Sequence, residues 1–107
     1  MDPIPCRAPA TGAVFAHVPV DDAASVQAAV DRARAAQPAW AALSVRERAR
    51  VLMRFRDLTR ERGSELTELL SLECGKPVME AYMAEVFTLL DLTTYFARRA
   101  HRILKPR

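Results

Sequence analysis

The chain has 107 residues, of which 50% are apolar and 27% are charged, and its formal net charge is +3. These values are typical of one small soluble domain or of a piece of a larger protein. No apolar run approaches the ~20 residues that cross a bilayer, and the N-terminus has no apolar core stretch, so we expect neither a membrane partner nor a secretory signal. With only two cysteines and no disulfide framework, a cytoplasmic location is expected.

Residues 1–20 are predicted to form an extended arm or a short hairpin. The Thr11-Gly12 pair is a turn signal. The small apolar residues after it alternate with other residues, which is the period of a strand. They are Val14, Ala16, Val18 and Val20.

A first helix is predicted over residues 22–37. Asp22 is suited to the N-cap, because its carboxylate can accept the free amides of the first turn. Apolar residues follow at helical spacing. They are Val26, Val30 and Ala33. Pro38 is expected to end the helix at Gln37, because proline lacks an amide hydrogen and restricts the residue before it.

The clearest element is a helix over residues 44–62. Ser44 and Glu47 have the spacing of a capping box, in which each side chain binds the other residue's backbone amide. One face of this helix is apolar and comprises Val45, Ala49, Leu52, Phe55 and Leu58. Gly63 is expected to end the helix. A shorter helix is predicted over residues 64–74, with Ser64 as its cap. Its buried positions are Leu66, Leu69 and Leu70.

The last predicted helix covers residues 77–104, with Pro77 at its first position. Its apolar face comprises Val86, Leu89, Leu90, Thr93, Phe96, Ala97 and Ala100. The predicted fold is therefore mainly α, with about four helices and a short N-terminal β-hairpin or arm. The short connections predict one compact unit.

Cys74 is the first candidate for chemistry, because it stands beside a glycine and a lysine. It is expected in the last turn of its helix, where the partial negative charge disfavours a thiolate, and Gly75 is expected to be a left-handed cap. Lys76 is expected to cover the last carbonyl groups of the helix. Neither His17 nor His101 is near Cys74 in the sequence. We interpret Cys74 as a structural residue.

Other patterns that support catalysis or binding are missing. The three glycines are widely separated, so no phosphate-binding loop is expected. The two histidines do not have metal-ligand spacing, and Glu80 and Glu85 do not share one tight face. The basic end, RRAHRILKPR, suggests nucleic acid, but arginines that complement a helix dipole explain it better. We therefore predict no catalytic, cofactor-binding or metal-binding residue and no nucleic-acid partner.

Three stretches resemble the N-terminal part of the NAD(P)-dependent aldehyde dehydrogenase superfamily, in the family's order and spacing. They are PATGAVFAHVPV, AVDRARAAQPAW and SVRERARVLMRFRDLTRERGSELTELLSLECGKPVMEA. The resemblance runs from about Pro9 to the end of the chain. Cys74 stands where the family most often has a threonine or another small polar residue, and the family's catalytic cysteine lies far beyond it. The resemblance therefore supports a structural role for Cys74.

The resemblance implies that this segment is part of an α/β cofactor-binding domain, which it wraps with helices and an extended arm. In that family a cysteine thiolate attacks an aldehyde, hydride passes to NAD or NADP, and a glutamate activates water to release the acid. These residues are expected beyond residue 107, so no cofactor is expected on this chain alone. In some members a carboxylate near the position of Glu85 helps to hold a monovalent cation.

Two hypotheses follow for residues 1–107. The first is an N-terminal fragment of an aldehyde dehydrogenase whose partner is the remainder of that chain or a homo-oligomer. The alternative is a stand-alone helical protein-binding module, which should close its apolar faces on themselves. No polar substitution interrupts those faces, so the sequence favours the fragment, and we expect the isolated chain to be marginally stable.

Overall fold

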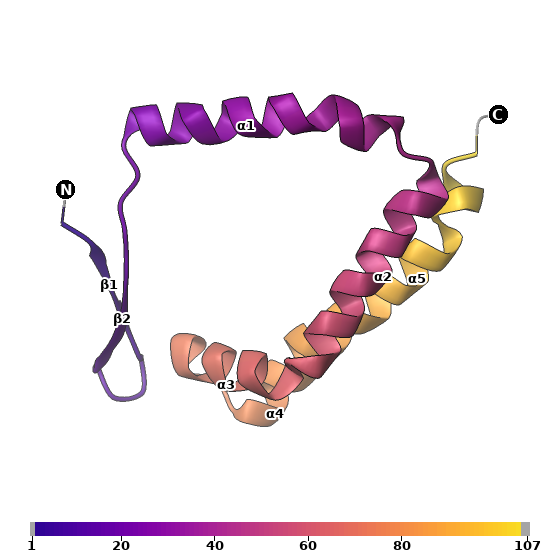
Figure 1. The fold of residues 1–107 in the computed structure, drawn as a ribbon. Helices are drawn as coiled ribbons and strands as arrows, with labels where there is room; N and C mark the ends of the chain where they lie inside the picture. The colour runs from indigo at the N-terminus through magenta and orange to yellow at the C-terminus, as the bar shows by residue number, and fades with distance from the viewer. Residues whose placement is uncertain (1, 106–107) are drawn as a thin grey trace.

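The computed structural model describes residues 2–105, so residues 1, 106 and 107 of the predicted domain lie outside the described part. A two-stranded hairpin is followed by helices, as Figure 1 shows, which confirms the predicted fold class. The elements are β1 (Ile4–Arg7), β2 (Val14–Val18), α1 (Ala23–Ala42), α2 (Val45–Glu61), α3 (Gly63–Cys74), α4 (Val78–Glu80), the π-helix η1 (Ala81–Phe87) and α5 (Thr88–Ile103).

The N-terminal arm is a hairpin in which β1 pairs antiparallel with β2. Ile4 lies opposite Val18, and the register shifts once near the loop. Gly12 has a φ of 71°, which a residue with a Cβ atom rarely adopts, and its amide donates to the carbonyl of Ala8 at 2.8 Å. The turn signal therefore marks the hairpin loop.

Helix α1 begins as predicted and ends later than predicted. Asp22 is its N-cap, and its carboxylate accepts the amide of Ser25 at 2.7 Å, which lowers the pKa of Asp22. The predicted end at Gln37 is wrong, because Pro38 lies inside a helix that continues to Ala42. No described residue of α1 is buried, so water can reach the carbonyl that proline leaves without a partner.

Helix α2 has the predicted capping box. The Ser44 amide donates to Glu47 Oε2 at 2.8 Å, and the Glu47 amide donates to Ser44 Oγ at 3.2 Å. These bonds favour the ionised carboxylate, so the pKa of Glu47 lies below its ordinary value of 4.5.

This lowered pKa predicts a pH dependence at the start of α2. A carboxyl group whose pKa is lower in the folded state stabilises that state above its ordinary pKa and loses the contribution as the pH falls through the folded value. We expect the NMR signal of the Ser44 amide to titrate with a midpoint below 4.5. The Glu47→Gln variant keeps a hydrogen-bonding side chain and should abolish this titration. A midpoint above 4.5 would contradict the conclusion that the capping box lowers the pKa of Glu47.

The junction of α2 and α3 differs from the prediction. Gly63 does not end α2 with a turn, and Ser64 is not a cap, because α3 begins at Gly63 without a side-chain cap. The Arg62 amide donates to the Leu58 carbonyl and the Leu66 amide to the Arg62 carbonyl, each at 3.0 Å, so helical bonding passes through the junction. A Cβ atom on Gly63 would lie 3.8 Å from Val86 Cγ1, which shows how closely η1 approaches here.

The predicted final helix is one continuous run with a wider π-helical segment inside it. Glu80 and Thr88, which flank η1, both have right-handed helical dihedrals. Pro77 is the N-cap, one position before its predicted place. Helix α5 then packs along α2, as Figure 1 shows. Its positions nearest α2 are buried or half-buried, and they are Leu90, Thr93, Thr94, Ala97 and Ala100.

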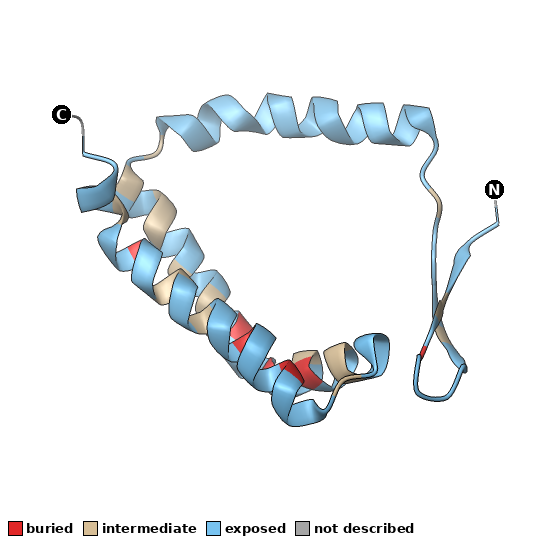
Figure 2. Cartoon of the chain, turned by 180° about the vertical axis from the view of Figure 1, so that it is seen from behind, coloured by how far each residue is buried: buried red, intermediate tan, exposed pale blue. Residues whose placement is uncertain are grey.

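The prediction of one compact unit is wrong. The radius of gyration is 18.1 Å, whereas a compact chain of this length has about 13 Å. Figure 2 shows exposed residues over most of every element. The buried apolar residues in the described part are few and mostly small, and they are Ala8, Ala81, Val86 and Ala97. The helices therefore leave most of their apolar surface without cover.

Candidate functional site

The turn after Cys74 joins the hairpin to the helices. Cys74 is the last residue of α3, and Gly75 follows it with a φ of 68°, which confirms the predicted left-handed cap. A Cβ atom on Gly75 would lie 3.2 Å from Pro9 Cβ. The hairpin loop therefore rests directly on this turn, and glycine meets both the left-handed dihedral and the close contact without strain.

Lys76 does not cover the end of α3, which corrects the prediction. Its Nζ donates to Glu85 Oε1 at 2.8 Å, and this bond raises the pKa of Lys76. Its carbonyl accepts Ser71 Oγ at 2.7 Å. The turn is thus tied to α3 by Ser71 and to η1 by Glu85. The carboxylate that was weighed as a cation ligand binds this lysine in the described structure.

The structure does not bring the other candidate residues together. His17 lies on β2 opposite Pro5, whereas His101 lies in the last turn of α5. Cys74 is exposed and has no hydrogen bond to either histidine in the described part. Within residues 2–105, no group of three or more histidine, cysteine, aspartate or glutamate side chains could hold a metal ion. No described helix is long and apolar enough to cross a membrane.

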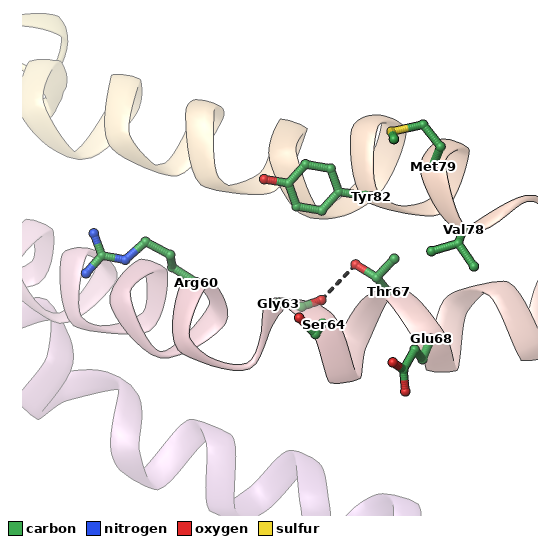
Figure 3. A pocket seen from close by; sticks show the side chains of 8 residues that line it. All are labelled: Arg60, Gly63, Ser64, Thr67, Glu68, Val78, Met79 and Tyr82. Carbon is green, nitrogen blue, oxygen red and sulfur yellow. Dashed lines mark hydrogen bonds between the residues drawn. The ribbon is translucent and has the colours of Figure 1, made fainter.

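Figure 3 shows the hollow between the α2–α3 junction and the α4–η1 segment. Its volume is about 490 Å³. Thr67 Oγ1 donates to the Gly63 carbonyl at 2.7 Å, so this hydroxyl is bonded to its own helix and is not directed at a ligand. The lining contains no histidine or cysteine and consists of Arg60, Gly63, Ser64, Thr67, Glu68, Val78, Met79 and Tyr82. This arrangement has no nucleophile paired with a base.

Large exposed apolar side chains gather on one side of α2 and α5, which run antiparallel in Figure 1. With about 100° between successive residues, Phe55 and Leu58 on α2 and Leu89 and Phe96 on α5 lie to the same side of the half-buried positions of these two helices. A cavity of about 310 Å³ extends this side onto α3. We call the apolar face the set of exposed residues Leu52, Phe55, Leu58, Leu69, Leu89, Leu92 and Phe96, whose exposed fractions are 41–54%.

The sequence pattern identified most residues of the apolar face as apolar positions at helical spacing, and Phe55 and Leu58 are 47% and 49% exposed. The prediction that Leu69 is buried is wrong, because this side chain is 47% exposed on the uncovered side of α3. Helix α2 packs against α5, and its half-buried residues include Val45, Ala49 and Met53. The apolar surface of α2 is wide enough to pack against two elements, and α5 is the one that the described residues provide.

This arrangement of hairpin, helices and open face occurs in a known class of proteins. A crystal structure of an NADP-dependent enzyme from E. coli matches 99% of this chain with a TM-score of 0.88 and 35% sequence identity. The chain covers 22% of that enzyme. The segment therefore has the fold of one part of a much larger enzyme.

Sequence comparison identifies the family. The family profile of the aldehyde dehydrogenases matches residues 1–107. Betaine aldehyde dehydrogenases of Rhizobium etli (strain CIAT 652) and Rhizobium leguminosarum bv. trifolii (strain WSM2304) are both 42% identical over 88 residues, which is 82% of this chain. The chain belongs to the aldehyde dehydrogenase family, which confirms the resemblance. It spans 18% of the length of these relatives, as expected for an N-terminal segment of such an enzyme.

Proposed function

We propose that this chain is the N-terminal helical part of an NAD(P)-dependent aldehyde dehydrogenase that oxidises an aldehyde to a carboxylic acid. Membership of the family supports this activity for the complete protein. In this proposal the nucleophile, the base and the cofactor site belong to the part of the enzyme beyond this segment.

The single observation that best supports this role is the exposed apolar face. Leucines and phenylalanines exposed by 41–54% would form a surface that soluble proteins normally cover. In the complete enzyme the remainder of the dehydrogenase chain covers this face, and residues 1–107 form the outer helical layer of the cofactor-binding domain. The partners of the segment are thus the rest of its own chain and other subunits of a homo-oligomer. The complete enzyme works in the cytoplasm.

This proposal predicts different cofactor binding for the segment and for the complete enzyme. Isothermal titration calorimetry of the purified 107-residue chain with NAD and with NADP should give no saturable heat, because the segment lacks a phosphate-binding loop. The complete enzyme should bind one of the two cofactors and reduce it when an aldehyde is added. Saturable binding by the segment alone would contradict the proposed division of roles. A complete protein that never reduces either cofactor with any aldehyde would contradict the proposed activity.

A further inference from the structure

The C-terminal half of α5 has a basic surface that the proposed activity does not use. Arg98, Arg99 and Arg102 surround a hollow of about 290 Å³. The same hollow is lined by Asp91, Thr94 and Tyr95, so its lining has three positive charges and one negative charge. We call these three arginines with Tyr95 the arginine surface.

One arginine of this surface is held in place before any ligand arrives. The Cζ atom of Arg99 lies 4.1 Å from the centre of the Tyr95 ring, which is a cation–π contact. Tyr95 in turn makes an edge-to-face contact with Phe96, with ring centres 5.2 Å apart. An ordered guanidinium loses less conformational freedom when it binds an anion than a free side chain does.

The arginines of this surface form no ion pair inside the described structure. The ion pairs among residues 2–105 involve Arg56, Arg60, Arg62 and Lys76, and none involves an arginine of the arginine surface. The helix dipole accounts for Arg102, which lies in the last turn with His101. It does not account for Arg98 and Arg99, because the effect of the dipole is confined to the last turn.

The arginine surface is also separate from the apolar face. With about 100° between successive residues, Arg98 and Arg102 point away from α2 and away from the stripe that contains Leu92 and Phe96. Both arginines are exposed. They therefore lie on a different side of α5 from the apolar face.

We propose that the arginine surface is a docking site for an acidic segment of a partner protein. Arg98 and Arg102 are one helical turn apart, about 6 Å along the axis, which matches two carboxylates that follow each other at the same spacing on a helix. Each planar guanidinium can bind a carboxylate through two parallel hydrogen bonds. Thr94 does not compete for the ligand, because its hydroxyl donates to the Leu90 carbonyl at 2.7 Å.

A protein ligand fits this surface better than a nucleic acid does. Stable duplex binding generally uses about 6–10 phosphate contacts along a groove, and this surface offers three arginines within about one turn. Single-stranded nucleic acid needs several free aromatic rings for base stacking, whereas the arginine surface has one aromatic ring, Tyr95, and one face of that ring is covered by Arg99.

The test measures binding of fluorescein-labelled poly-L-glutamate to the full-length native protein by fluorescence anisotropy at low salt. The Arg98→Gln/Arg102→Gln variant should weaken binding about tenfold, as expected for the loss of two exposed ion pairs. The matched control is Arg32→Gln/Arg34→Gln, which removes the same charge from exposed positions on α1 and should leave binding unchanged. Circular dichroism checks that both variants fold, and higher salt should weaken the specific binding.

Each result bears on the proposal. Tenfold weakening in the α5 variant alone supports the docking site. Equal weakening in both variants overturns it, since binding would then depend on net charge. Absence of peptide binding at low salt also overturns it. If duplex DNA of matched charge binds more tightly than the peptide and is lost in the α5 variant, the ligand is a nucleic acid and the proposal of a protein partner is wrong.

Discussion

Replacing Phe96 by alanine is expected to destabilise the complete protein by about 3–5 kcal/mol and the isolated 107-residue chain by only about 1 kcal/mol, the value of its edge-to-face contact with Tyr95. The difference arises because Phe96 is 54% exposed in the isolated chain and belongs to the apolar face that the remainder of the enzyme is proposed to cover. The measurement is the free energy of urea unfolding of both chains, followed by circular dichroism.

The control for this experiment is Arg54→Ala, an exposed position on the polar side of α2, which should change neither chain appreciably. A large loss of stability in the isolated chain would mean that Phe96 is already packed there, as the alternative of a stand-alone module requires. An unchanged complete protein would mean that nothing covers the apolar face, and the proposed packing would be wrong.

Replacing Gly75 by alanine should destabilise the chain more than the same change at Gly12. Both glycines have a left-handed φ, 68° and 71°, so each variant bears a similar conformational penalty of about 1–2 kcal/mol. Only at Gly75 would the new methyl group meet a neighbour, Pro9 Cβ at 3.2 Å, whereas nothing lies within 4 Å of the position at Gly12.

The difference in unfolding free energy between the Gly75→Ala and Gly12→Ala variants should therefore measure how strongly the hairpin loop is held on the turn after Cys74. We expect the Gly75→Ala variant to be about 1 kcal/mol less stable than the Gly12→Ala variant, with faster amide exchange in β1 and β2. Equal stability of the two variants, with unchanged exchange in the hairpin, would show that Pro9 moves aside freely and that this contact does not hold the hairpin.

The elements that the sequence predicted correctly depend on residues close together in the chain. The capping box of Ser44 and Glu47 and the cap at Asp22 each join residues three positions apart. The left-handed cap at Gly75 likewise depends on the last turn of α3. Such local bonds form whatever surrounds them, so spacing and residue type are sufficient to predict them.

The incorrect predictions depended on surroundings that local spacing does not specify. Pro38 was expected to end α1, but its helix is exposed and tolerates the lost hydrogen bond. Gly63 was expected to end α2, but it is the first residue of α3, and its Cβ position lies at ordinary van der Waals distance from Val86, 23 positions later in the chain. Glycine can stand both where two helices touch and where a helix ends.

The turn after Cys74 was predicted only in part, because some of its bonds are local and others join residues far apart in the chain. The turn after Cys74 follows from its glycine, whereas the Lys76–Glu85 pair joins residues nine positions apart. Glu85 lies in the π-helical segment, whose wider turn shifts the faces of the helix relative to a regular count of 3.6 residues per turn. A regular helical wheel therefore cannot place Glu85 correctly relative to the turn.

The contact between Pro9 and Gly75 has a consequence for the order of events during synthesis. These residues are 66 positions apart, and at about 5–20 residues per second the ribosome needs about 3–13 s to make the chain between them. Throughout that interval the hairpin has no surface on which to dock, and an isolated two-stranded hairpin is marginally stable in water. The first strands made are thus among the last to acquire their neighbours, because their loop has no turn to contact until α3 and Gly75 have emerged.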